Sequence, residues 1–431
     1  MIIYLGLGSN QGDRKANLTN AINQLAEKKV QLRHASPVIE TPALLPDNAP
    51  WEWNQPFLNM VIECSTDITP DALLAQIHQI QDSAGRTNKS RWSPRPIDID
   101  ILLWGAETIS TDQLTIPHRD MHLRHFVLTP LISLNANLTI PGRGNKTVLQ
   151  WSRELPHHIP LWMGILNITP DSFSDGGKHE NFGATQETMQ TMVDWGASIL
   201  DIGGESTRPG ADTIDPETEW SRVAPVLQYL RDEGSDNPLR PLISLDTRNP
   251  DIAEKAIDIG VDFINDVSGV SDPKMIELAA SSSCQWIAMH SLSVPADPTI
   301  TIPPNVDPVQ EVHQWLSDQI VRWDKAGIDP HRMVFDPGIG FSKNPLQSLR
   351  LLQSASEFRQ HGLRLLAGHS RKSFMKQFAG NETHERDMVT IGAAMQLCQQ
   401  GVDIIRVHNI PDHIAAYRGW AHLAEQARLK G

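Results

Sequence analysis

The sequence has few cysteines, no long apolar run and no excess of basic residues, and each absence excludes a class of protein. The three cysteines, Cys64, Cys284 and Cys398, lie far apart and lack metal-binding spacing, which predicts reduced thiols and a cytoplasmic location. No apolar stretch approaches the length of a membrane span. The first residues, MIIYLGLGSN, lack the basic region and cleavage site of a signal peptide. We therefore expect no membrane association.

The charge balance is acidic. A net charge of −14 at pH 7 argues against non-specific binding of nucleic acid. Anionic small molecules must then be attracted by local clusters of Arg and Lys. At 431 residues, the chain is long enough for two or three domains.

The most informative segment is IDIDI, which begins at Ile97. Its alternation of apolar and acidic residues predicts a strand with Asp98 and Asp100 on one face. Two carboxylates one pleat apart repel each other unless a cation lies between them, and hard oxygen ligands suit one or two Mg²⁺. Basic residues that could meet a polyphosphate lie just upstream: Arg86, Lys89, Arg91 and Arg95. The pattern indicates metal-assisted phosphoryl transfer, with a salt-bridged exposed strand as the alternative.

Further short motifs flank this strand in a fixed order. They are GLGSN at Gly6–Asn10, Thr41–Pro42, Phe57–Asn59, Gly85–Arg86, Ile116–His118 and Arg124–Phe126. Together they resemble 6-hydroxymethyl-7,8-dihydropterin pyrophosphokinase over about residues 1–155. The acidic strand is the most specific part of the resemblance, and GLGSN alone would be weak.

This resemblance implies transfer of pyrophosphate from ATP to 6-hydroxymethyl-7,8-dihydropterin, with two Mg²⁺ held by Asp98 and Asp100. Arg86 and Arg95 would be catalytic and would neutralise charge on the triphosphate together with His118. The implied ATP site comprises Arg86, Lys89, Arg91, Trp92, Arg95, His118 and Arg124. The implied pterin site comprises Thr41, Pro42, Phe57, Asn59 and Phe126, where Asn59 reads the pterin edge and the two phenylalanines enclose the ring. Taken alone, Phe126 would more simply be a core residue.

The pattern of the chain changes near Pro156–Pro160. Before this point, strands and two amphipathic helices at about 14–28 and 70–84 indicate a compact α+β layer. After it, apolar strands alternate regularly with helical stretches. The eight predicted strands are Leu161–Ile168, Ile199–Gly204, Leu242–Thr247, Phe263–Val267, Trp286–His290, Met333–Gly338, Leu363–Gly368 and Asp403–His408.

Eight βα units in roughly 270 residues have the size of a (β/α)₈ barrel. An open doubly wound sheet is the alternative, but its Gly-rich phosphate fingerprint is missing after the first strand. Several helices have a start signal in which Asp or Asn precedes Pro, at Asp215, Asn249, Asp272, Asp307 and Asn344. Nearly every strand ends on polar residues: Asn167, Asp201 to Glu205, Asp246, Asn265 and Asp266, His290, Asp336, Ser370, Arg406 and His408. Because active sites of such barrels form at the carboxyl ends of the strands, these residues predict one converging site.

Four stretches of this half are more specific. They are GILNITPDSFSDGG at Gly164–Gly177, GGESTRPG at Gly203–Gly210, SRKS at Ser370–Ser373 and RVH at Arg406–His408. Together they closely resemble dihydropteroate synthase over about residues 159–431. The resemblance implies condensation of the pterin diphosphate with 4-aminobenzoate to give 7,8-dihydropteroate and pyrophosphate.

We therefore predict a bifunctional α/β enzyme of folate biosynthesis. The resemblances imply an N-terminal α+β, ferredoxin-like pyrophosphokinase domain at residues 1–156 and a C-terminal (β/α)₈ TIM barrel at 159–431. They also imply inhibition by sulfonamides and a homodimer formed through the barrel. One alternative is a pterin-binding barrel that moves a methyl group to a corrinoid, and GGESTRPG and SRKS argue against it. The other is a folate-regulated scaffold with an inactive kinase half, which the intact acidic pair and Arg95 disfavour.

Residue chemistry in the barrel agrees with the resemblance. A pterin edge presents N–H donors beside a carbonyl, so the carboxylates of Asp246 and Asp336 are matched acceptors and Asn265 suits a mixed edge. Arg406 and His408 lie two apart on the last strand and share a face, as pyrophosphate-binding residues should. The resemblance assigns Asn167 to one Mg²⁺ on the pyrophosphate, Lys372 to the catalytic face of the pterin, and Thr207 and Arg208 to a loop over the reacting centre.

Simpler interpretations stay open for some of these residues. Asp246 or Asp336 could cap a helix, and Lys372 could be a solvated lysine. Arg406 lies among apolar residues, and a cation there needs an anion. Gln81 replaces an expected acid, Asn88 an expected base, and the loop between Thr41 and Asn59 is longer than expected and carries two tryptophans. His369 before SRK has no explanation at this level.

Overall fold

The computed structural model describes residues 1–85, 92–156, 158–168, 178–205, 214–234, 236–295, 297, 299–380 and 382–428. The chain forms two compact units. The first comprises Met1–Ile159, Asp236–Arg240 and Ala415–Gly431, and the second comprises Pro160–Ser235 and Pro241–Ile414. No helix in the described part of the chain is long and apolar enough to cross a bilayer.

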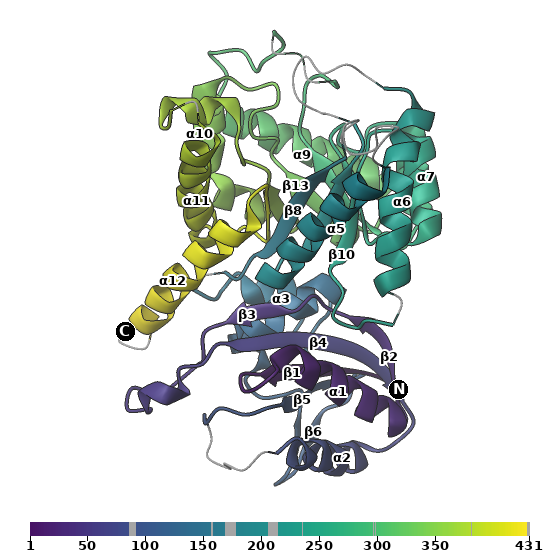
Figure 1. The fold of residues 1–431 in the computed structure, drawn as a ribbon, viewed down its shortest axis with the longest axis vertical. Coiled ribbons are helices and arrows are strands. Elements are labelled where there is room, and N and C mark those ends of the chain that lie inside the picture. Colours follow the sequence, from purple (N-terminus) through teal and green to yellow (C-terminus); the bar gives the residue numbers. More distant parts are fainter. Residues whose placement is uncertain are drawn as a thin grey trace. The chain divides into compact units, whose positions relative to one another are not determined.

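The first unit is built on a five-stranded antiparallel sheet (Figure 1). Its strands follow the order β2-β4-β1-β5, and β3 pairs with β4. The strands are β1 (Ile2–Ser9), β2 (Val30–Ala35), β3 (Ile39–Thr41), β4 (Phe57–Thr66) and β5 (Asp98–Trp104), and a small hairpin joins β6 (Ile109–Ser110) to β7 (Thr115–Ile116). The helices are α1 (Arg14–Glu27), α2 (Pro70–Ser83), α3 (His125–Leu134) and α4 (Val148–Ser152).

Helices cover both faces of this sheet. Ile3 and Leu5 of β1 belong to a core with residues of α1 and α2, whereas Tyr4 packs with residues of α3 and α4. Successive side chains of β1 therefore contribute to two hydrophobic cores, because they point to opposite faces of the sheet. The predicted helices at 14–28 and 70–84 are present as α1 and α2. They begin at the side-chain caps of Asp13 and Thr69.

The second unit contains a closed barrel of eight parallel strands in the order β10-β11-β12-β13-β14-β15-β8-β9. The strands are β8 (Leu161–Asn167), β9 (Ile199–Gly203), β10 (Leu242–Asp246), β11 (Phe263–Asp266), β12 (Gln285–Met289), β13 (Met333–Asp336), β14 (Arg364–Ala367) and β15 (Ile404–Val407). All eight predicted strands are present, and each ends one or two residues earlier than predicted. The predicted fold class is thus confirmed for both halves.

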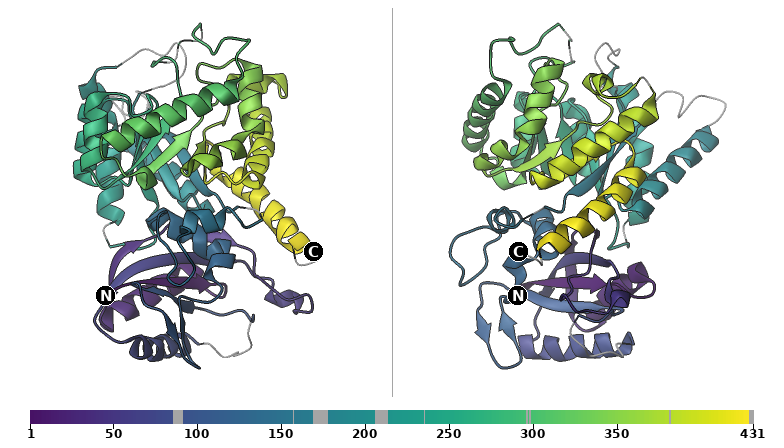
Figure 2. Two further views of the ribbon diagram at one scale, coloured as in Figure 1. Left: turned by 180° about the vertical axis from the view of Figure 1, so that it is seen from behind. Right: turned by 90° about the vertical axis from the view of Figure 1, so that its left-hand side faces the viewer.

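Helices surround the barrel (Figure 2). They are α5 (Lys178–Trp195), α6 (Pro216–Gly234), α7 (Pro250–Ile259), α8 (Pro273–Ser281), α9 (Pro308–Lys325), α10 (Pro345–Gln353) and α11 (Thr383–Gln399). The last helix, α12 (Ile410–Arg428), begins in the second unit and belongs to the first from Ala415 onwards. Four of the predicted start signals are caps with Pro in the first turn: Asn249, Asp272, Asp307 and Asn344. At the fifth, the Asp215 carboxylate accepts the Thr218 amide at 2.9 Å.

A glycine after β13 gives the barrel rim a point of close backbone approach. Gly338 has a φ of +67°, and a Cβ there would lie 1.9 Å from the carbonyl oxygen of His290. We expect Gly338→Ala to lower the free energy of unfolding by at least about 3 kcal/mol, because both the backbone angle and the contact forbid a side chain. Gly392→Ala, inside α11 with no atom near the added carbon, should instead stabilise by about 0.5–1 kcal/mol. Urea titrations of the two variants measure the contrast, and equal stabilities would contradict it.

Candidate active sites

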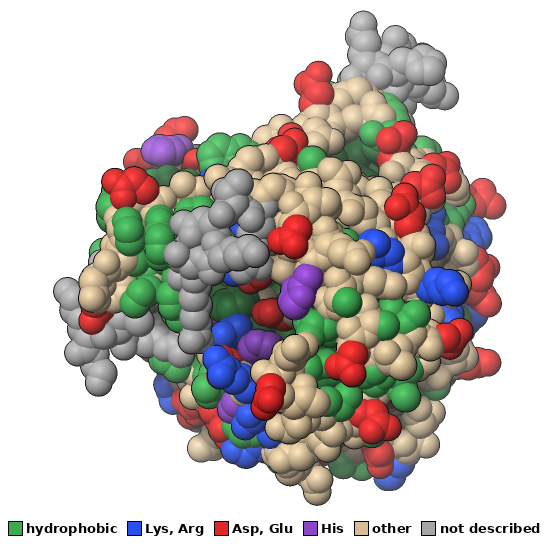
Figure 3. All heavy atoms as spheres, turned by 90° about the horizontal axis from the view of Figure 1, so that it is seen from below, with side chains coloured by type: hydrophobic (Ala, Val, Ile, Leu, Met, Phe, Trp, Pro, Cys, Tyr) green, Lys and Arg blue, Asp and Glu red, His purple; other side chains and the backbone are tan. Residues whose placement is uncertain are grey.

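The first unit contains a cavity of about 410 Å³, a volume typical of small-molecule sites. Its lining comes from β1, the end of β3, β4, β5, α2 and the segment that leads into α3. Figure 3 shows a hollow with Lys, Arg and His side chains gathered beside it. Arginines thus line the cavity beside its aspartates although the chain is acidic overall.

The two predicted carboxylates lie together on the cavity wall. Asp98 and Asp100 on β5 line the cavity, and their side chains are 32% and 39% exposed. Ile99, between them, is 5% exposed on the opposite face. The predicted alternation is confirmed, and both carboxylates present oxygen atoms to the same space.

Cations and a neutral donor surround these carboxylates. Nη1 of Arg95 lies 3.2 Å from both carboxylate oxygens of Asp98. Nε2 of Gln81 donates to Oδ1 of Asp98 at 3.3 Å. Arg124 Nη1 and His118 Nε2 each lie 3.9 Å from Oδ2 of Asp100. Gln81 therefore supplies a hydrogen-bond donor where an acid would have added a third negative charge.

The GLGSN motif holds one of these cations in place. Arg95 donates its backbone N–H to Oδ1 of Asn10 at 2.8 Å, and Asn10 donates its own to the carbonyl of Arg95 at 3.2 Å. Arg95 is 9% exposed, and its Nε also donates to the carbonyl of Ser93. These two reciprocal hydrogen bonds join segments that are distant in the sequence. They explain how the GLGSN motif contributes to the cavity.

His118 lines the cavity. Burial, together with the charge of Arg124, lowers the pKa of His118 to about 4. The neutral imidazole is therefore favoured at pH 7, and it offers a hydrogen bond to the site. Its predicted role beside the triphosphate stays a prediction.

The predicted pterin residues all line the same cavity: Thr41, Pro42, Phe57, Asn59 and Phe126. Asn59 is buried, and its Nδ2 donates to Oγ1 of Thr41 at 2.8 Å. With Nδ2 on Thr41, the amide oxygen Oδ1 of Asn59 faces the space beside Gly8. A Cβ at Gly8 would lie 2.9 Å from that acceptor, Oδ1 of Asn59, so the glycine keeps the space in front of it open.

Trp92 also lines the cavity, with a φ of +80°. The remaining predicted residues lie outside the described part of the chain. They are Arg86, Lys89 and Arg91 in the kinase half and Thr207 and Arg208 in the barrel half. Their roles stay predictions.

In the barrel, predicted residues occupy the carboxyl ends of several strands. Asn167 ends β8, Asp246 ends β10 and Asp336 ends β13, while Asn265 is the third residue of β11. Ring closure of the strands brings these ends to one rim, where active sites of such barrels form.

Arg406 on β15 is the centre of this rim. Its Nε lies 2.6 Å from Oδ2 of Asp201, and its Nη2 lies 2.6 Å from Oδ2 of Asp246. Asp201 also accepts from Oγ of Ser244 at 2.6 Å and from Nδ2 of Asn265 at 3.1 Å. Burial alone would lower the pKa of Arg406, but the two carboxylates outweigh it and raise that pKa. The anion that the sequence required beside Arg406 is thus provided by the protein itself.

Asp246 retains one free acceptor. Its Oδ1 is buried and finds no hydrogen-bond partner among the described residues. Burial raises the pKa of Asp246, and Arg406 opposes that shift. A buried acceptor without a partner is costly, so this atom calls for a donor from a ligand. Asp336 differs, because its Oδ1 accepts the Gly338 amide at 2.8 Å.

Lys372 and His408 lie on the loops that follow β14 and β15. Nζ of Lys372 lies 3.9 Å from the centroid of the Phe341 ring, a cation–π contact. Oγ of Ser370 accepts the His408 amide at 3.2 Å and lies 2.9 Å from Nδ1 of the same residue. The hydroxyl of Ser370 thus contacts both the backbone and the ring of His408.

Sequence analysis missed two members of this site. Asp201 was predicted only as one of the polar residues at strand ends, because nothing in the sequence marks it as the partner of Arg406. Lys343 is buried, and its Nζ lies 2.7 Å from Nδ1 of His290 and donates to the carbonyls of His290 and Phe341 at 3.1 and 2.9 Å. Burial lowers the pKa of Lys343 to about 7. A single lysine after a strand resembles any solvated lysine, so only the structure reveals it.

Comparison with known proteins agrees with both halves. Residues 163–408 match the family described as pterin binding enzyme. Residues 4–136 match the family described as 7,8-dihydro-6-hydroxymethylpterin-pyrophosphokinase. The folate synthesis bifunctional protein of Chlamydia muridarum is 34% identical, and the match covers 97% of this chain and 98% of that protein.

Solved structures resemble the barrel half. A dihydropteroate synthase from Anaplasma phagocytophilum with bound 6-hydroxymethylpterin-monophosphate has 35% identity and a TM-score of 0.56, covering 61% of this chain and 98% of its own. The dihydropteroate synthase of Xanthomonas albilineans with 4-aminobenzoic acid has 34% identity and a TM-score of 0.55, covering 61% and 93%.

His369, unexplained by the sequence, is a buried packing residue whose Nε2 lies 3.1 Å from the carbonyl oxygen of Thr390. Burial lowers its pKa from 6.5 to about 4. Between those values the unfolded chain binds the proton more readily, so stability is lost as the pH falls from 6.5 towards 4. The shift corresponds to roughly 3 kcal/mol.

We therefore expect the unfolding free energy of the wild type to drop more between pH 7 and pH 4 than that of His369→Gln, which keeps an N–H donor without a titrating ring. Urea titrations at several pH values measure the difference. The other buried histidines are common to both proteins and cancel. A difference that stays constant with pH would show that His369 does not titrate in this way.

Proposed function

The chain belongs to the family of bifunctional folate synthesis proteins, and we propose that its two reactions run in the two sites described above. It is a pyrophosphokinase for 6-hydroxymethyl-7,8-dihydropterin and a dihydropteroate synthase. The observation that carries the site assignment is the pair Asp98 and Asp100 beside Arg95 and Arg124 in one cavity. The match to a bifunctional relative over nearly the whole chain disfavours a corrinoid methyltransferase and an inactive scaffold.

We assign the kinase domain to residues 1–156 and the synthase domain to 159–431. Support comes from the family matches at 4–136 and 163–408, which leave the segment around Pro156–Pro160 between them. The contact pattern also divides the chain after Ile159, but it groups Asp236–Arg240 and Ala415–Gly431 with the first unit.

The carboxylates of the kinase cavity fit Mg²⁺. The described part of the chain contains no cluster of three or more side chains that could hold a metal by themselves. Mg²⁺, however, is commonly held by one or two carboxylates together with substrate phosphates, which is the donor set that Asp98 and Asp100 offer. Two bound Mg²⁺ would neutralise charge on the triphosphate.

In the kinase reaction, the hydroxymethyl oxygen of the pterin attacks the β-phosphorus of ATP and loses its proton to solvent. The bond from that phosphorus to the oxygen shared with the α-phosphate breaks, and AMP leaves with the electron pair. Arg95 and Arg124 stabilise the negative charge, joined by Arg86, Lys89 and Arg91, while His118 donates a hydrogen bond. Catalysis here consists mostly of positioning and charge stabilisation.

At the other end of the cavity, Thr41, Pro42 and Asn59 hold the pterin edge, and Phe57 and Phe126 flank the ring. Oδ1 of Asn59 accepts an N–H of the pterin. This assignment is supported by the Asn59–Thr41 hydrogen bond, which turns the amide oxygen away from Thr41, and by the open space at Gly8.

In the synthase reaction, the C–O bond of the pterin diphosphate breaks and pyrophosphate leaves. The nitrogen of 4-aminobenzoate bonds to the methylene carbon and loses a proton. Asp246, through its unpartnered Oδ1, accepts an N–H of the pterin, with Asn265 and Asp336 beside it. Nε2 of His408 donates to the leaving pyrophosphate, and Lys372 covers the ring where the amine arrives.

Asn167 at the end of β8 would offer its amide oxygen to one Mg²⁺ on the pyrophosphate. Arg406 sits on the same rim, but its charge is shared with Asp201 and Asp246. Its proposed contribution is therefore to hold Asp246 in place as well as to attract the anion. Thr207 and Arg208 would complete the 4-aminobenzoate side.

Three further proposals concern partners and location. Sulfonamides carry an arylamine like that of 4-aminobenzoate and should compete with it at the synthase site. The barrel is proposed to form a homodimer. A cytoplasmic location is supported by the thiols of Cys64, Cys284 and Cys398, all buried and free.

The acidic pair predicts a selective defect. Asp98→Asn keeps the shape of the side chain but removes a charged ligand. AMP release from ATP and the pterin alcohol should fall on the order of 10³-fold or more. Dihydropteroate formation from the preformed pterin diphosphate and 4-aminobenzoate should be unchanged.

Asp246→Asn is the matched control, and it should show the reverse pattern. Both variants are assayed for both products in the same buffer with ATP, Mg²⁺ and 4-aminobenzoate. If Asp98→Asn released AMP at the wild-type rate, the assignment of the kinase site would have to be abandoned.

A further inference from the structure

The loop after β14 directs two consecutive basic side chains to different places. Lys372 lies against the Phe341 ring in the synthase site. Arg371, just before it, extends to helix α11 and has a φ of +56°. A residue with a side chain rarely adopts this left-handed conformation, so surrounding contacts must hold it.

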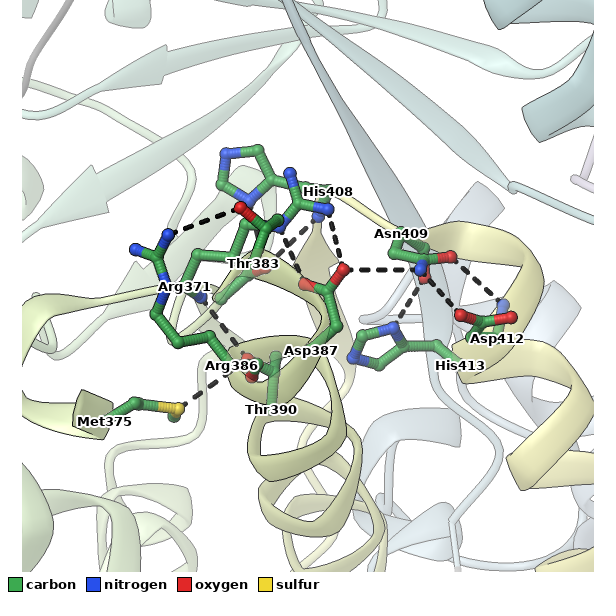
Figure 4. A network of polar contacts seen from close by, with 11 residues as sticks. Arg371, Met375, Thr383, Arg386, Asp387, Thr390, His408, Asn409, Asp412 and His413 are labelled. Carbon is green, nitrogen blue, oxygen red and sulfur yellow. Dashed lines mark hydrogen bonds and ion pairs between the residues drawn. The ribbon is translucent and has the colours of Figure 1, made fainter. Parts of the chain in front are cut away.

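Those contacts come from one face of α11 (Figure 4). The Arg371 guanidinium donates from Nε to Oδ1 of Asp387 at 2.7 Å and from Nη2 to Oδ2 at 2.8 Å. The backbone N–H of Arg371 donates to Oγ1 of Thr390 at 3.3 Å. Thr390 lies three residues after Asp387 and therefore on the same side of the helix. The side chain and the backbone of Arg371 are thus both bound to α11.

Asp387 also reaches the loop that follows β15. Its Oδ2 lies 3.4 Å from Nδ2 of Asn409, the residue after His408, and Asn409 in turn accepts the Asp412 amide at the start of α12. One buried carboxylate therefore connects the loop that carries Lys372 with the loop that carries His408. We name Arg371, Asp387 and Asn409 the α11 clamp.

Arg371 itself is a poor candidate for binding substrate anions. Two of its nitrogens are engaged by Asp387, whose side chain is only 6% exposed. A carboxylate buried to that extent needs a counter-charge. The planar fork of an arginine satisfies both of its oxygens, which the single ammonium of a lysine does not.

We propose that Arg371 is a positioning residue for dihydropteroate formation. Through the bidentate bond to Asp387, it holds the backbone of its loop in the left-handed conformation that places Lys372 in the synthase site. This inference rests on the proposed function of Lys372.

The test uses the full-length chain and three variants. Arg371→Gly permits the left-handed backbone but removes the tether, Arg371→Lys keeps the charge but loses the fork, and Asp387→Asn removes the other half of the pair. We expect kcat for dihydropteroate formation to fall on the order of tenfold or more in Arg371→Gly and Asp387→Asn, because a misplaced catalytic group costs rate. Arg371→Lys should be intermediate.

The KM for the pterin diphosphate should change by less than about threefold, because the pterin is held by residues of other strands. The double variant Arg371→Gly/Asp387→Asn should lose no more activity than the worse single variant, since both act through one clamp. Full, independent losses in the double variant would contradict a shared clamp.

Two controls separate positioning from folding. AMP release by the kinase half of the same molecule should stay at the wild-type rate in every variant. Lys274→Ala removes an exposed ion pair between α7 and α8 and should leave both activities unchanged. If the clamp variants shift the unfolding midpoint but keep wild-type kcat and KM, the clamp only stabilises the fold and the proposal fails.

Two further comparisons identify which idea has failed. Lys372→Met should lose dihydropteroate formation; if it does not, the proposed function of Lys372 is wrong. If it does while Arg371→Gly remains fully active, only the positioning proposal is wrong. Finally, millimolar guanidinium chloride should not rescue Arg371→Gly, because a free ion cannot tether the loop. Rescue would show that Arg371 merely neutralises Asp387.

Discussion

Buried charge without water is the constraint on which the barrel site depends. Arg406 is surrounded by apolar neighbours on β15 and would be unstable there alone. Asp201 on β9 and Asp246 on β10 supply its counter-charges, each with a carboxylate oxygen 2.6 Å from an Arg406 nitrogen. Because each of these carboxylates must serve Arg406, only one oxygen of Asp246 remains for a ligand. The ion pairs that stabilise the rim therefore also decide which atoms a substrate can meet.

The kinase cavity also contains neighbouring carboxylates, but their charge is balanced in a different way. Its carboxylates are partly exposed, so the protein does not neutralise them fully. Arg95 and Gln81 engage Asp98, and the reciprocal backbone bonds between Asn10 and Arg95 hold that arginine in place. The neutral His118 keeps the total positive charge of the cavity modest. The two carboxylates therefore keep oxygen atoms exposed to the cavity, which suits the proposed binding of Mg²⁺.

The strands could be predicted well from the sequence, because apolar runs and the two-residue alternation of side chains are local properties. It predicted Asp98 and Asp100 on one face for the same reason. The polar strand ends identified the rim of the barrel, and the predicted strands ran one or two residues into it. What the sequence could not provide were pairings between distant residues. Arg406 and Asp201 are 205 positions apart, and no local pattern connects them.

Protonation was equally out of reach. The lowered pKa of His118 depends on burial and on Arg124, which only the folded chain brings near. Lys343 was not singled out, because its contact with His290 joins residues 53 positions apart. The bonds of Arg371 to α11 and its left-handed backbone angle likewise occur together only in the folded chain, and no local sequence pattern predicts them.

Closure of the barrel has a consequence for the order in which the protein can be completed on the ribosome. The five strands of the first sheet all lie before residue 105, so that sheet can be assembled while most of the chain is still untranslated. The barrel closes only where β15 pairs with β8, after the other barrel strands have been synthesised. Until then Asp201 and Asp246 have no Arg406. Two carboxylates on nascent strands must remain hydrated, and their repulsion opposes premature collapse of a partly synthesised barrel.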